Sequence, residues 1–355
     1  MKKILVFLLL TASFVFPAQI VLDETPELFD LVEYYAGNTC VFRMVYDGSV
    51  DPLNPPIVET NAVVVGRIRK WTPPKEQLLK LHECGSKFNL IAIHGMDPGE
   101  VDGPMTPYKV RLSELFKRIG ERLKINTYLF VYSTLLAEPE KVAQAFNELT
   151  ASMENIVIFA HSMGGLIAEH VVEKSGNVLG IVFSGVPHLG SPFADVLFVH
   201  PKDFEKVLGL PKSKAENLRT VLVLSYNSFN VVHAPGYRNL LWGRVPRDFS
   251  RVHHVNLVGK ISLKGLSDVS TAFFNMLRTS FRDTAALLSL KLISESISEL
   301  KPEFSETDGV VPVASTSFGG NVLMYQADHE DLYVNEEIVY EGISYILLRL
   351  LEERM

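Results

Sequence analysis

Apolar runs of two kinds alternate along most of this sequence, and their pattern predicts an α/β fold. Short continuous apolar runs bounded by polar or turn-forming residues are typical of buried strands. Longer stretches with apolar residues at every third or fourth position are typical of helices that pack on a sheet. Because the two kinds alternate, we expect a mostly parallel central sheet flanked by helices. The expected strands are residues 40–46, 62–68, 89–93, 127–132, 155–160, 180–184, 252–258 and 321–325.

Helical spacing predicts the elements between these strands. In residues 138–153, Val142, Ala145, Phe146 and Leu149 fall on one face. The first two strands, which a Pro-rich loop separates, could form an antiparallel pair ahead of the parallel sheet. The expected helices are residues 111–123, 138–153, 165–174 and 336–351.

Two stretches, 192–218 and 261–300, do not fit the alternation of strands and helices. We expect them to be helical insertions over the edge of the sheet, where they would form a cap or lid. Ordinary core helices remain the alternative for both. Residues 19–355, with these two stretches as insertions, are expected to form one domain, because no linker or repeat divides them.

The N-terminus has the features of an export signal. Lys2 and Lys3 precede an apolar run over residues 4–16, and Pro17 and Ala18 follow. The run is shorter than the roughly 20 apolar residues that a membrane-spanning helix needs, although an uncleaved anchor remains an alternative. We therefore expect a signal peptide over residues 1–18 and a secreted, periplasmic or envelope-associated protein.

Composition narrows the function further. The chain has 355 residues, of which 47% are hydrophobic and 21% charged, as in globular proteins. A formal net charge of -7 without a dense basic run opposes nucleic acid as a partner. Cys40 and Cys84 are the only cysteines, and they either form one disulfide or remain free. His253 and His254 are adjacent in an expected strand and would point to opposite faces, so we expect neither a metal site nor a cofactor.

One segment carries a chemical signature. Residues 156–165 read Ile-Val-Ile-Phe-Ala-His-Ser-Met-Gly-Gly, a buried strand that runs directly into a small-residue turn and then a helix. Ala160 and Gly164, two residues before and after Ser162, are small enough to let a strained turn lift the serine hydroxyl clear of its neighbours. The helix that follows would direct its N-terminal N–H groups toward developing negative charge. The pattern predicts Ser162 as a nucleophile.

This segment resembles the nucleophile elbow of the α/β-hydrolase superfamily, and in particular of its lipase-like serine esterases. Residues 94–96, His-Gly-Met, are similar to the oxyanion loop of that family, and residues 185–192, Gly-Val-Pro-His-Leu-Gly-Ser-Pro, are similar to a segment common in such lipases. A more distant similarity connects the chain with deacylases of inositol phospholipids. The resemblance implies an α/β-hydrolase fold with oxyanion donors at the amides of Met96 and Met163. It implies site-shaping roles for His94, Gly95, His161 and His188.

A serine hydroxyl needs an imidazole to take its proton and a carboxylate to orient that imidazole. In the superfamily the acid and then the histidine follow the serine along the chain. Asp308 lies in a Thr-Asp-Gly-Val-Val-Pro turn, and His329 follows the expected strand 321–325. Asp328 adjoins His329 and therefore cannot readily direct its carboxylate at the same ring. We predict a triad of Ser162, His329 and Asp308.

These predictions together describe an enzyme that cleaves esters through an acyl-enzyme. The apolar insertions and the export signal favour a lipid or long-chain acyl ester as substrate, with peripheral contact to a membrane as a further expectation. The triad fixes the reaction step and leaves the acceptor open, so an acyltransferase, a thioesterase or an amidase remains an alternative. A non-catalytic binding protein with a hydrolase fold is the alternative from another class.

Overall fold

The computed structural model describes residues 20–21, 29–36, 39–45, 64–198, 234–261 and 306–353. The predicted signal peptide, residues 1–18, lies outside the described residues. So do most of the two predicted insertions, 192–218 and 261–300. The described beginning of the first insertion is a helix, α4(Pro192–Phe198), as expected.

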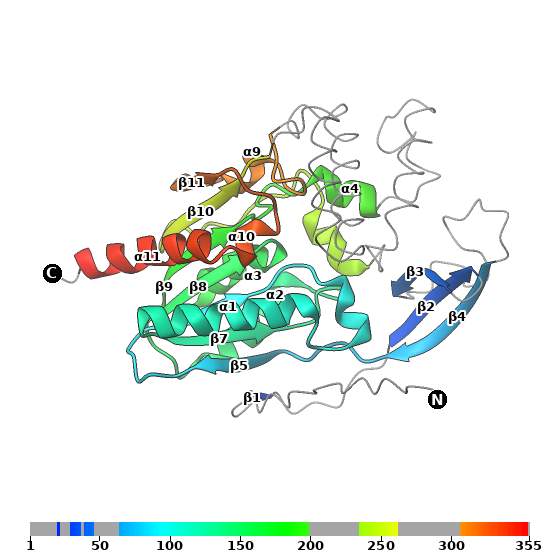
Figure 1. Cartoon of the computed structure of the whole chain (residues 1–355), viewed down its shortest axis with the longest axis horizontal. Coiled ribbons are helices and arrows are strands. Elements are labelled where there is room, and N and C mark those ends of the chain that lie inside the picture. The colour runs from blue at the N-terminus through cyan, green and yellow to red at the C-terminus, as the bar shows by residue number, and fades with distance from the viewer. Residues whose placement is uncertain are drawn as a thin grey trace, which may run out of the picture.

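A mostly parallel sheet forms the centre of the molecule (Figure 1). In its described part the strand order is β1-β5-β7-β6-β8-β9-β10-β11. β5 runs antiparallel to both of its neighbours, and the strands from β7 to β11 are parallel. This confirms the predicted sheet. The strands are β1(Ile20–Val21), β5(Gln77–His82), β6(Asn89–Ile93), β7(Asn126–Val131), β8(Ile156–His161), β9(Val178–Ser184), β10(His253–Gly259) and β11(Val322–Tyr325).

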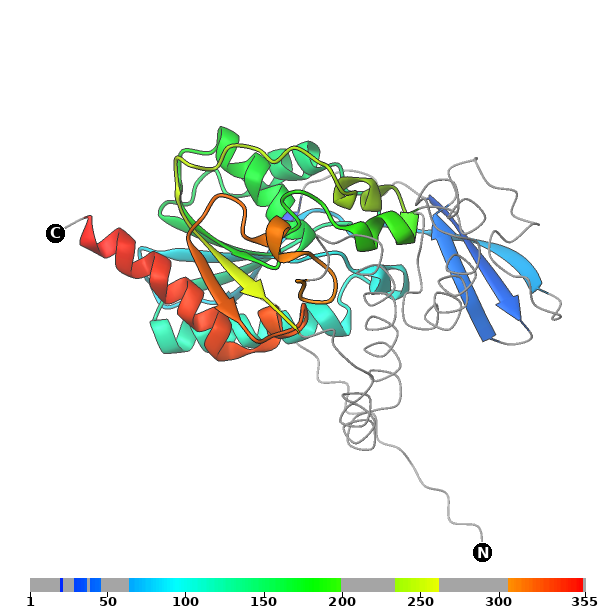
Figure 2. The same cartoon turned by 90° about the horizontal axis from the view of Figure 1, so that it is seen from above.

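Helices cover both faces of this sheet (Figure 2). One face packs against α1(Pro107–Leu123) and α11(Glu336–Glu352), and the other packs against α2(Pro139–Leu149) and α3(Met163–Lys174). Two hydrophobic cores result, one on each side of the sheet. The shorter described helices are η1(Pro98–Asp102), η3(Pro235–Leu240), α9(Val313–Thr316) and α10(Asp331–Val334).

The strand order reverses direction at β6, and this reversal creates a crevice. β6 lies between β7 and β8 although the chain runs from β6 to β7 and then to β8. The connections after β6 and β7 therefore leave toward opposite sides, which opens a space beyond the carboxyl ends of β6 and β8. Such switch points are where open α/β sheets bind ligands. Residues 94–97 follow β6 there, and Ser162 follows β8.

A small antiparallel sheet lies beside the main one, with the order β3-β2-β4 (Figure 1). Its strands are β2(Phe29–Ala36), β3(Thr39–Val45) and β4(Val64–Trp71). The predicted pairing of residues 40–46 with 62–68 is wrong, because β2 lies between them and pairs with both. β2 was not predicted from the sequence because the charged Glu33 interrupts its apolar residues. Its carboxylate is buried but paired with Arg69 at 2.8 Å and Arg43 at 3.2 Å.

The long connection after β10 begins and ends at paired positions. The Ile261 N–H donates to the Thr307 carbonyl at 2.9 Å, and the two residues form an isolated β-bridge. Residues 262–305 lie outside the described part of the chain, and the described positions on either side of them are held together by this bridge.

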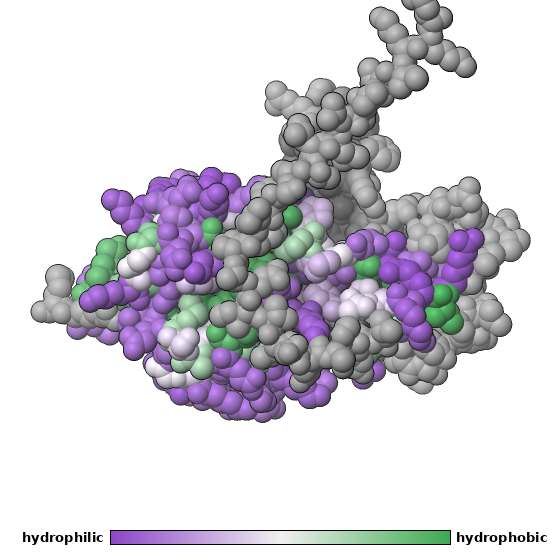
Figure 3. All heavy atoms as spheres, turned by 90° about the horizontal axis from the view of Figure 1, so that it is seen from below, coloured by the Kyte–Doolittle hydropathy of each residue, from purple (hydrophilic) through white to green (hydrophobic). Residues whose placement is uncertain are grey.

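The described surface is mostly hydrophilic on the face shown in Figure 3, where hydrophobic residues occur in separate patches. Within the described ranges, no helix combines the length and the apolar character needed to cross a membrane. Cys84 is exposed and carries a free thiol, so it forms no disulfide with Cys40. The side chain of Cys40 lies outside the described part of the chain.

Candidate active site

Ser162 occupies a strained turn between β8 and α3. Its backbone has φ 53° and ψ -126°, a conformation that residues with side chains seldom adopt. The turn fits only because its neighbours are small. A Cβ atom on Gly164 would lie 2.4 Å from the Ile93 carbonyl oxygen, and one on Gly95 would lie 2.7 Å from the Ser162 Cβ. The strand, turn and helix predicted around Ser162 are therefore all present.

Asp308 and His329 form a tightly bonded pair. The His329 Nδ1 lies 2.7 Å from the Asp308 Oδ2, and the His329 amide donates to the Asp308 carbonyl at 2.9 Å. The other carboxylate oxygen, Oδ1, accepts from the amides of Val310 at 2.9 Å and Val311 at 2.7 Å. Because the carboxylate accepts at Nδ1, that nitrogen carries the proton, and the His329 Nε2 is left as the basic atom.

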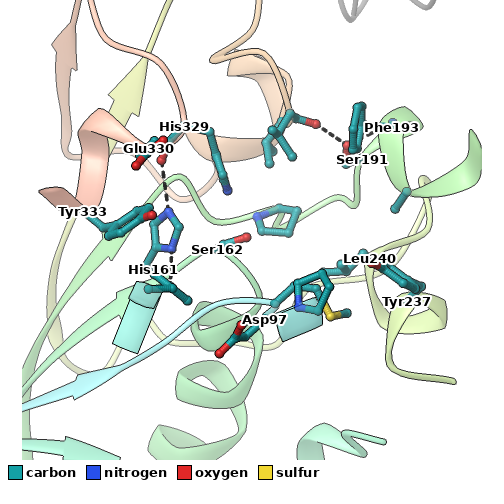
Figure 4. A pocket seen from close by; sticks show the side chains of 17 residues that line it. Asp97, His161, Ser162, Ser191, Phe193, Tyr237, Leu240, His329, Glu330 and Tyr333 are labelled. Atoms are coloured by element: carbon teal, nitrogen blue, oxygen red, sulfur yellow. Dashed lines mark hydrogen bonds between the residues drawn. The ribbon is translucent and has the colours of Figure 1, made fainter. Parts of the chain in front are cut away.

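Ser162 and His329 line the same cavity, which has a volume of about 300 Å³. In Figure 4 both side chains project into this space. Ligand sites have volumes of roughly 300–1,000 Å³, so the cavity is at the small end of that range. Most of the other side chains in its wall are apolar. They include Met96, Pro98, Pro187, Phe193, Ala194, Tyr237, Leu240, Val310 and Val311.

The two carboxylates in the wall of this cavity are paired with cations. Asp97 lies 3.0 Å from the Nζ of Lys109, which is completely buried. Glu330 lies 2.7 Å from Arg111 at the surface. The described wall therefore offers apolar contacts and directed hydrogen-bonding groups rather than an uncompensated charge.

The resemblance predicts that the amides of Met96 and Met163 act as oxyanion donors, and both amides lack an acceptor among the described residues. Helix α3 begins at Met163, so the Met163 N–H has no acceptor within the helix. The amides on either side of Met96 are already used, since Gly95 donates to the Tyr108 hydroxyl at 2.7 Å and Asp97 donates to the Thr134 hydroxyl at 3.0 Å. No acceptor for the Met96 N–H is found among the described residues. Both amides are available for a ligand oxygen.

The loop after β6 is fixed by buried polar groups that sequence reasoning missed. Besides its pair with Lys109, Asp97 accepts from the Thr106 hydroxyl at 2.6 Å. Glu100 is buried and accepts from the Ser133 hydroxyl at 2.6 Å and from the Thr134 amide at 2.8 Å. Burial nonetheless raises the pKa of the Glu100 carboxyl. These contacts tie the loop to the end of β7 and to α1.

His94 supports the same loop and is not exposed to the cavity. It is fully buried, its Nδ1 donates to the Gly95 carbonyl at 2.9 Å, and its ring stacks on Tyr132 at 4.6 Å. Burial, with Lys109 nearby, lowers the pKa of His94 well below its usual 6.5. Its Nε2 accepts from the Tyr132 amide at 3.5 Å, so both nitrogens of this neutral imidazole are bonded, which fits the loop-shaping role predicted for it.

His188 does not itself line the cavity, although Pro187 and Ser191 of the same segment do. It is completely buried, with Nδ1 at 2.7 Å from Glu169 and Nε2 at 3.2 Å from the Asn256 side chain. Arg244 also binds Glu169, at 2.9 Å. Burial alone would raise the pKa of Glu169, but the hydrogen bonds from His188 and Arg244 hold it below the usual value. His188 joins α3 to β10 behind the site, and Ser191 from the same segment reaches the wall.

The rival residues considered from the sequence have other partners. Asp328 accepts from the Asp331 amide at 2.8 Å, and burial raises its pKa, while the His329 ring is bonded to Asp308. His253 pairs with Glu353 and His254 packs against another ring, so the two diverge as expected for adjacent strand residues. In the described ranges, no group of three or more His, Cys, Asp or Glu side chains is placed to hold a metal ion.

Comparisons with known proteins found similarity only at low sequence identity. Neither a protein-family model nor a curated protein matches the sequence. Among solved structures, the mature lipase of Bacillus licheniformis is 15% identical over 75% of this chain and 94% of its own, with a TM-score of 0.40. A metagenomic carboxyl esterase is 16% identical over 76% and 77% of the two chains, with a TM-score of 0.40. A bromoperoxidase from Bacillus anthracis is 12% identical over 77% and 96%, with a TM-score of 0.38.

Similarities at this level do not determine an activity. The fold class follows from the chain itself, through a mostly parallel sheet with helices on both faces and a strained strand–turn–helix at Ser162. This is the α/β-hydrolase fold that the sequence predicted.

Proposed function

We propose that this protein is a serine ester hydrolase, a lipase or esterase that works through an acyl-enzyme. The observation that supports the proposal best is the shared cavity, where the strained Ser162 and the His329–Asp308 pair meet. In the proposed mechanism each group has one task in acyl transfer. Ser162 attacks the ester carbonyl, His329 takes the hydroxyl proton, and Asp308 holds the His329 tautomer.

The remaining steps use atoms already described. As the tetrahedral intermediate forms, its oxyanion accepts hydrogen bonds from the amides of Met96 and Met163. His329 then gives its proton to the departing alcohol, and the acyl group stays on the Ser162 oxygen. Water attacks this acyl-enzyme with His329 again acting as the base, and the free acid leaves.

The apolar wall supports an acyl chain as the group that enters the cavity. Each buried methylene contributes about 0.8 kcal/mol, so kcat/KM should rise roughly fourfold for each added carbon until the cavity is full. A series of nitrophenyl esters from acetate upward measures this rise and where it ends. Thioester and amide substrates with the same acyl group test the alternative leaving groups.

Labelling with a fluorophosphonate tests the nucleophile directly. The wild-type protein should be labelled, and Ser162→Ala should lose both labelling and ester hydrolysis while it keeps its thermal midpoint. Ser191→Ala is the matched control, because Ser191 is the other serine in the described wall and its hydroxyl donates to the Val310 carbonyl. A folded wild-type protein that resists labelling, or a label on Ser191, would overturn the assignment.

The proposal includes export, on the basis of the N-terminal sequence. The basic start and apolar run of residues 1–18 support a substrate outside the cytoplasm, with contact to a membrane surface as part of the same proposal. Mass spectrometry of the protein after expression with its own N-terminus tests cleavage after Ala18. A chain that retains residues 1–18 and remains in the cytosolic fraction would contradict export.

A further inference from the structure

Two side chains, the half-buried Tyr108 and the buried His161, connect the loop after β6 with the loop that carries His329. The Gly95 amide donates to the Tyr108 hydroxyl oxygen at 2.7 Å. That oxygen lies 2.8 Å from the His161 Nδ1, and the His161 Nε2 lies 3.2 Å from the His329 carbonyl oxygen. These contacts form a continuous chain of three hydrogen bonds, and Figure 4 shows the two that meet at His161 in the cavity wall.

The direction of every hydrogen bond in this chain is fixed. The Tyr108 oxygen accepts from Gly95, so its own proton is donated to the His161 Nδ1. The His329 carbonyl can only accept, so the His161 Nε2 carries the ring proton. Burial supports this assignment, since it lowers the pKa of His161 well below 6.5 and raises the pKa of Tyr108 well above 10. Both groups are therefore uncharged at neutral pH.

The two ends of the chain coincide with the two parts of the proposed reaction. Gly95 directly precedes Met96, whose amide is a proposed oxyanion donor, and it packs against the Ser162 Cβ. At the other end, the carbonyl belongs to His329 itself, and the His161 ring packs on the His329 ring with centroids 4.8 Å apart. A neutral His161 at this distance does not oppose the positive charge that His329 acquires when it takes the serine proton.

We propose that Tyr108 and His161 are positioning residues. They keep the oxyanion loop and the base His329 at a fixed position relative to each other during acyl transfer. This inference rests on the proposed function. Their polar atoms act through Gly95 and through the His329 backbone, so neither side chain supplies a proton or an oxyanion contact. Losing one of them should displace a reacting group without removing it, and a displacement of about 1 Å can cost roughly 100-fold in rate.

Three substitutions separate positioning from simple structural support. Tyr108→Phe removes the hydroxyl, His161→Phe keeps an aromatic ring without its nitrogens, and His161→Gln keeps one acceptor and one N–H donor. For the folded proteins we expect the first two to lower kcat about 10- to 100-fold with KM changed less than about twofold. His161→Gln should recover most of kcat. Tyr325→Phe is the matched control, because its hydroxyl bonds Glu341 of α11 at 2.9 Å and neither residue lines the cavity.

Each outcome decides the question. Wild-type kcat in folded Tyr108→Phe would overturn the proposal, as would a kcat in His161→Gln as low as in His161→Phe. Should His161→Phe fail to fold, low kcat in Tyr108→Phe together with recovery in His161→Gln supports the proposal, and any other combination contradicts it. Fluorophosphonate labelling of the wild-type protein separates the two proposals, since its absence refutes the hydrolase assignment itself.

Discussion

Replacement of Asp308 by Asn should abolish activity through a hydrogen bond that the structure forces into the wrong direction. The Asp308 Oδ1 accepts from the amides of Val310 and Val311, so the oxygen of an Asn side chain must occupy that place. Its NH₂ group then faces the His329 Nδ1, where a carboxylate oxygen lies 2.7 Å away in the native protein. The Nδ1 must become an acceptor, and the proton moves to Nε2.

The expected loss is large because the base acquires the wrong tautomer. With a proton on Nε2, His329 cannot take the Ser162 proton, and a substitution of this kind lowers kcat roughly 10,000-fold, or about 5.4 kcal/mol of transition-state stabilisation. Steady-state hydrolysis of a nitrophenyl ester and the rate of fluorophosphonate labelling both measure it. Both should fall together, since both need an activated serine.

Asp328→Asn provides the matched control. Asp328 is adjacent to His329 in sequence, but its carboxylate accepts from the Asp331 amide and does not touch the ring. Its kcat should stay within about twofold of the wild-type value, because the His329 tautomer is untouched. The reasoning would be refuted by a folded Asp308→Asn enzyme that keeps more than about a tenth of its kcat, or by an equal loss in Asp328→Asn.

Two further predictions follow from the packing around the histidines. Gly185 has φ +59°, and Gly185→Ala would place a methyl group 3.0 Å from the His329 ring, so kcat should fall about 10- to 100-fold. Gly176→Ala is the control, because a methyl group there has no neighbour within 4 Å, and its kcat should not change. Equal kcat values for the two variants in an ester assay would contradict this prediction. Burial holds the pKa of His94 and His161 well below 6.5 in the folded protein. As pH falls below 6.5, these two histidines are therefore protonated in the unfolded chain but remain neutral in the folded one. The stability they provide is complete above that pH and is lost below it, at up to about 1.4 kcal/mol per pH unit for each group. Calorimetry between about pH 7.5 and 5 should give a shallower decrease for His161→Gln than for the wild-type protein, and parallel curves would disprove it.

The sequence predicts the buried strands well because a parallel sheet covered on both faces is built from continuous apolar runs. β6 has the predicted bounds, and β8 is shifted by one residue. The strands that were missed carry polar residues for reasons of tertiary structure. β2 contains Glu33, which is neutralised by arginines from its neighbours. β5 lies near the edge of the sheet, and Gln77, Lys80 and His82 interrupt its leucines.

In the candidate site, too, some residues could be predicted from the sequence and others could not. Ser162 is recognisable because its turn is a local feature with small residues at fixed positions, and Asp308 and His329 follow in the expected order. Lys109 is different, because a lysine in an amphipathic helix usually reaches water and its buried partner Asp97 comes from a separate loop. The role of Tyr108 likewise cannot be predicted from the sequence, because its partners Gly95 and His161 come close to it only in the folded protein. Pairings of this kind depend on the folded arrangement and leave no periodicity in the sequence.

The bridge between Ile261 and Thr307 bears on what fixes the position of Asp308. Because the pairing holds Thr307 beside the end of β10, the residue directly before Asp308 is anchored by the main domain. When the two ends of a connection are already held together, a doubling of its length costs only about 0.6 kcal/mol in closure entropy. A variant with a different number of residues between 261 and 307 should therefore keep the Asp308–His329 pair, which makes this junction a point where the chain tolerates a change in length without losing its acid and base.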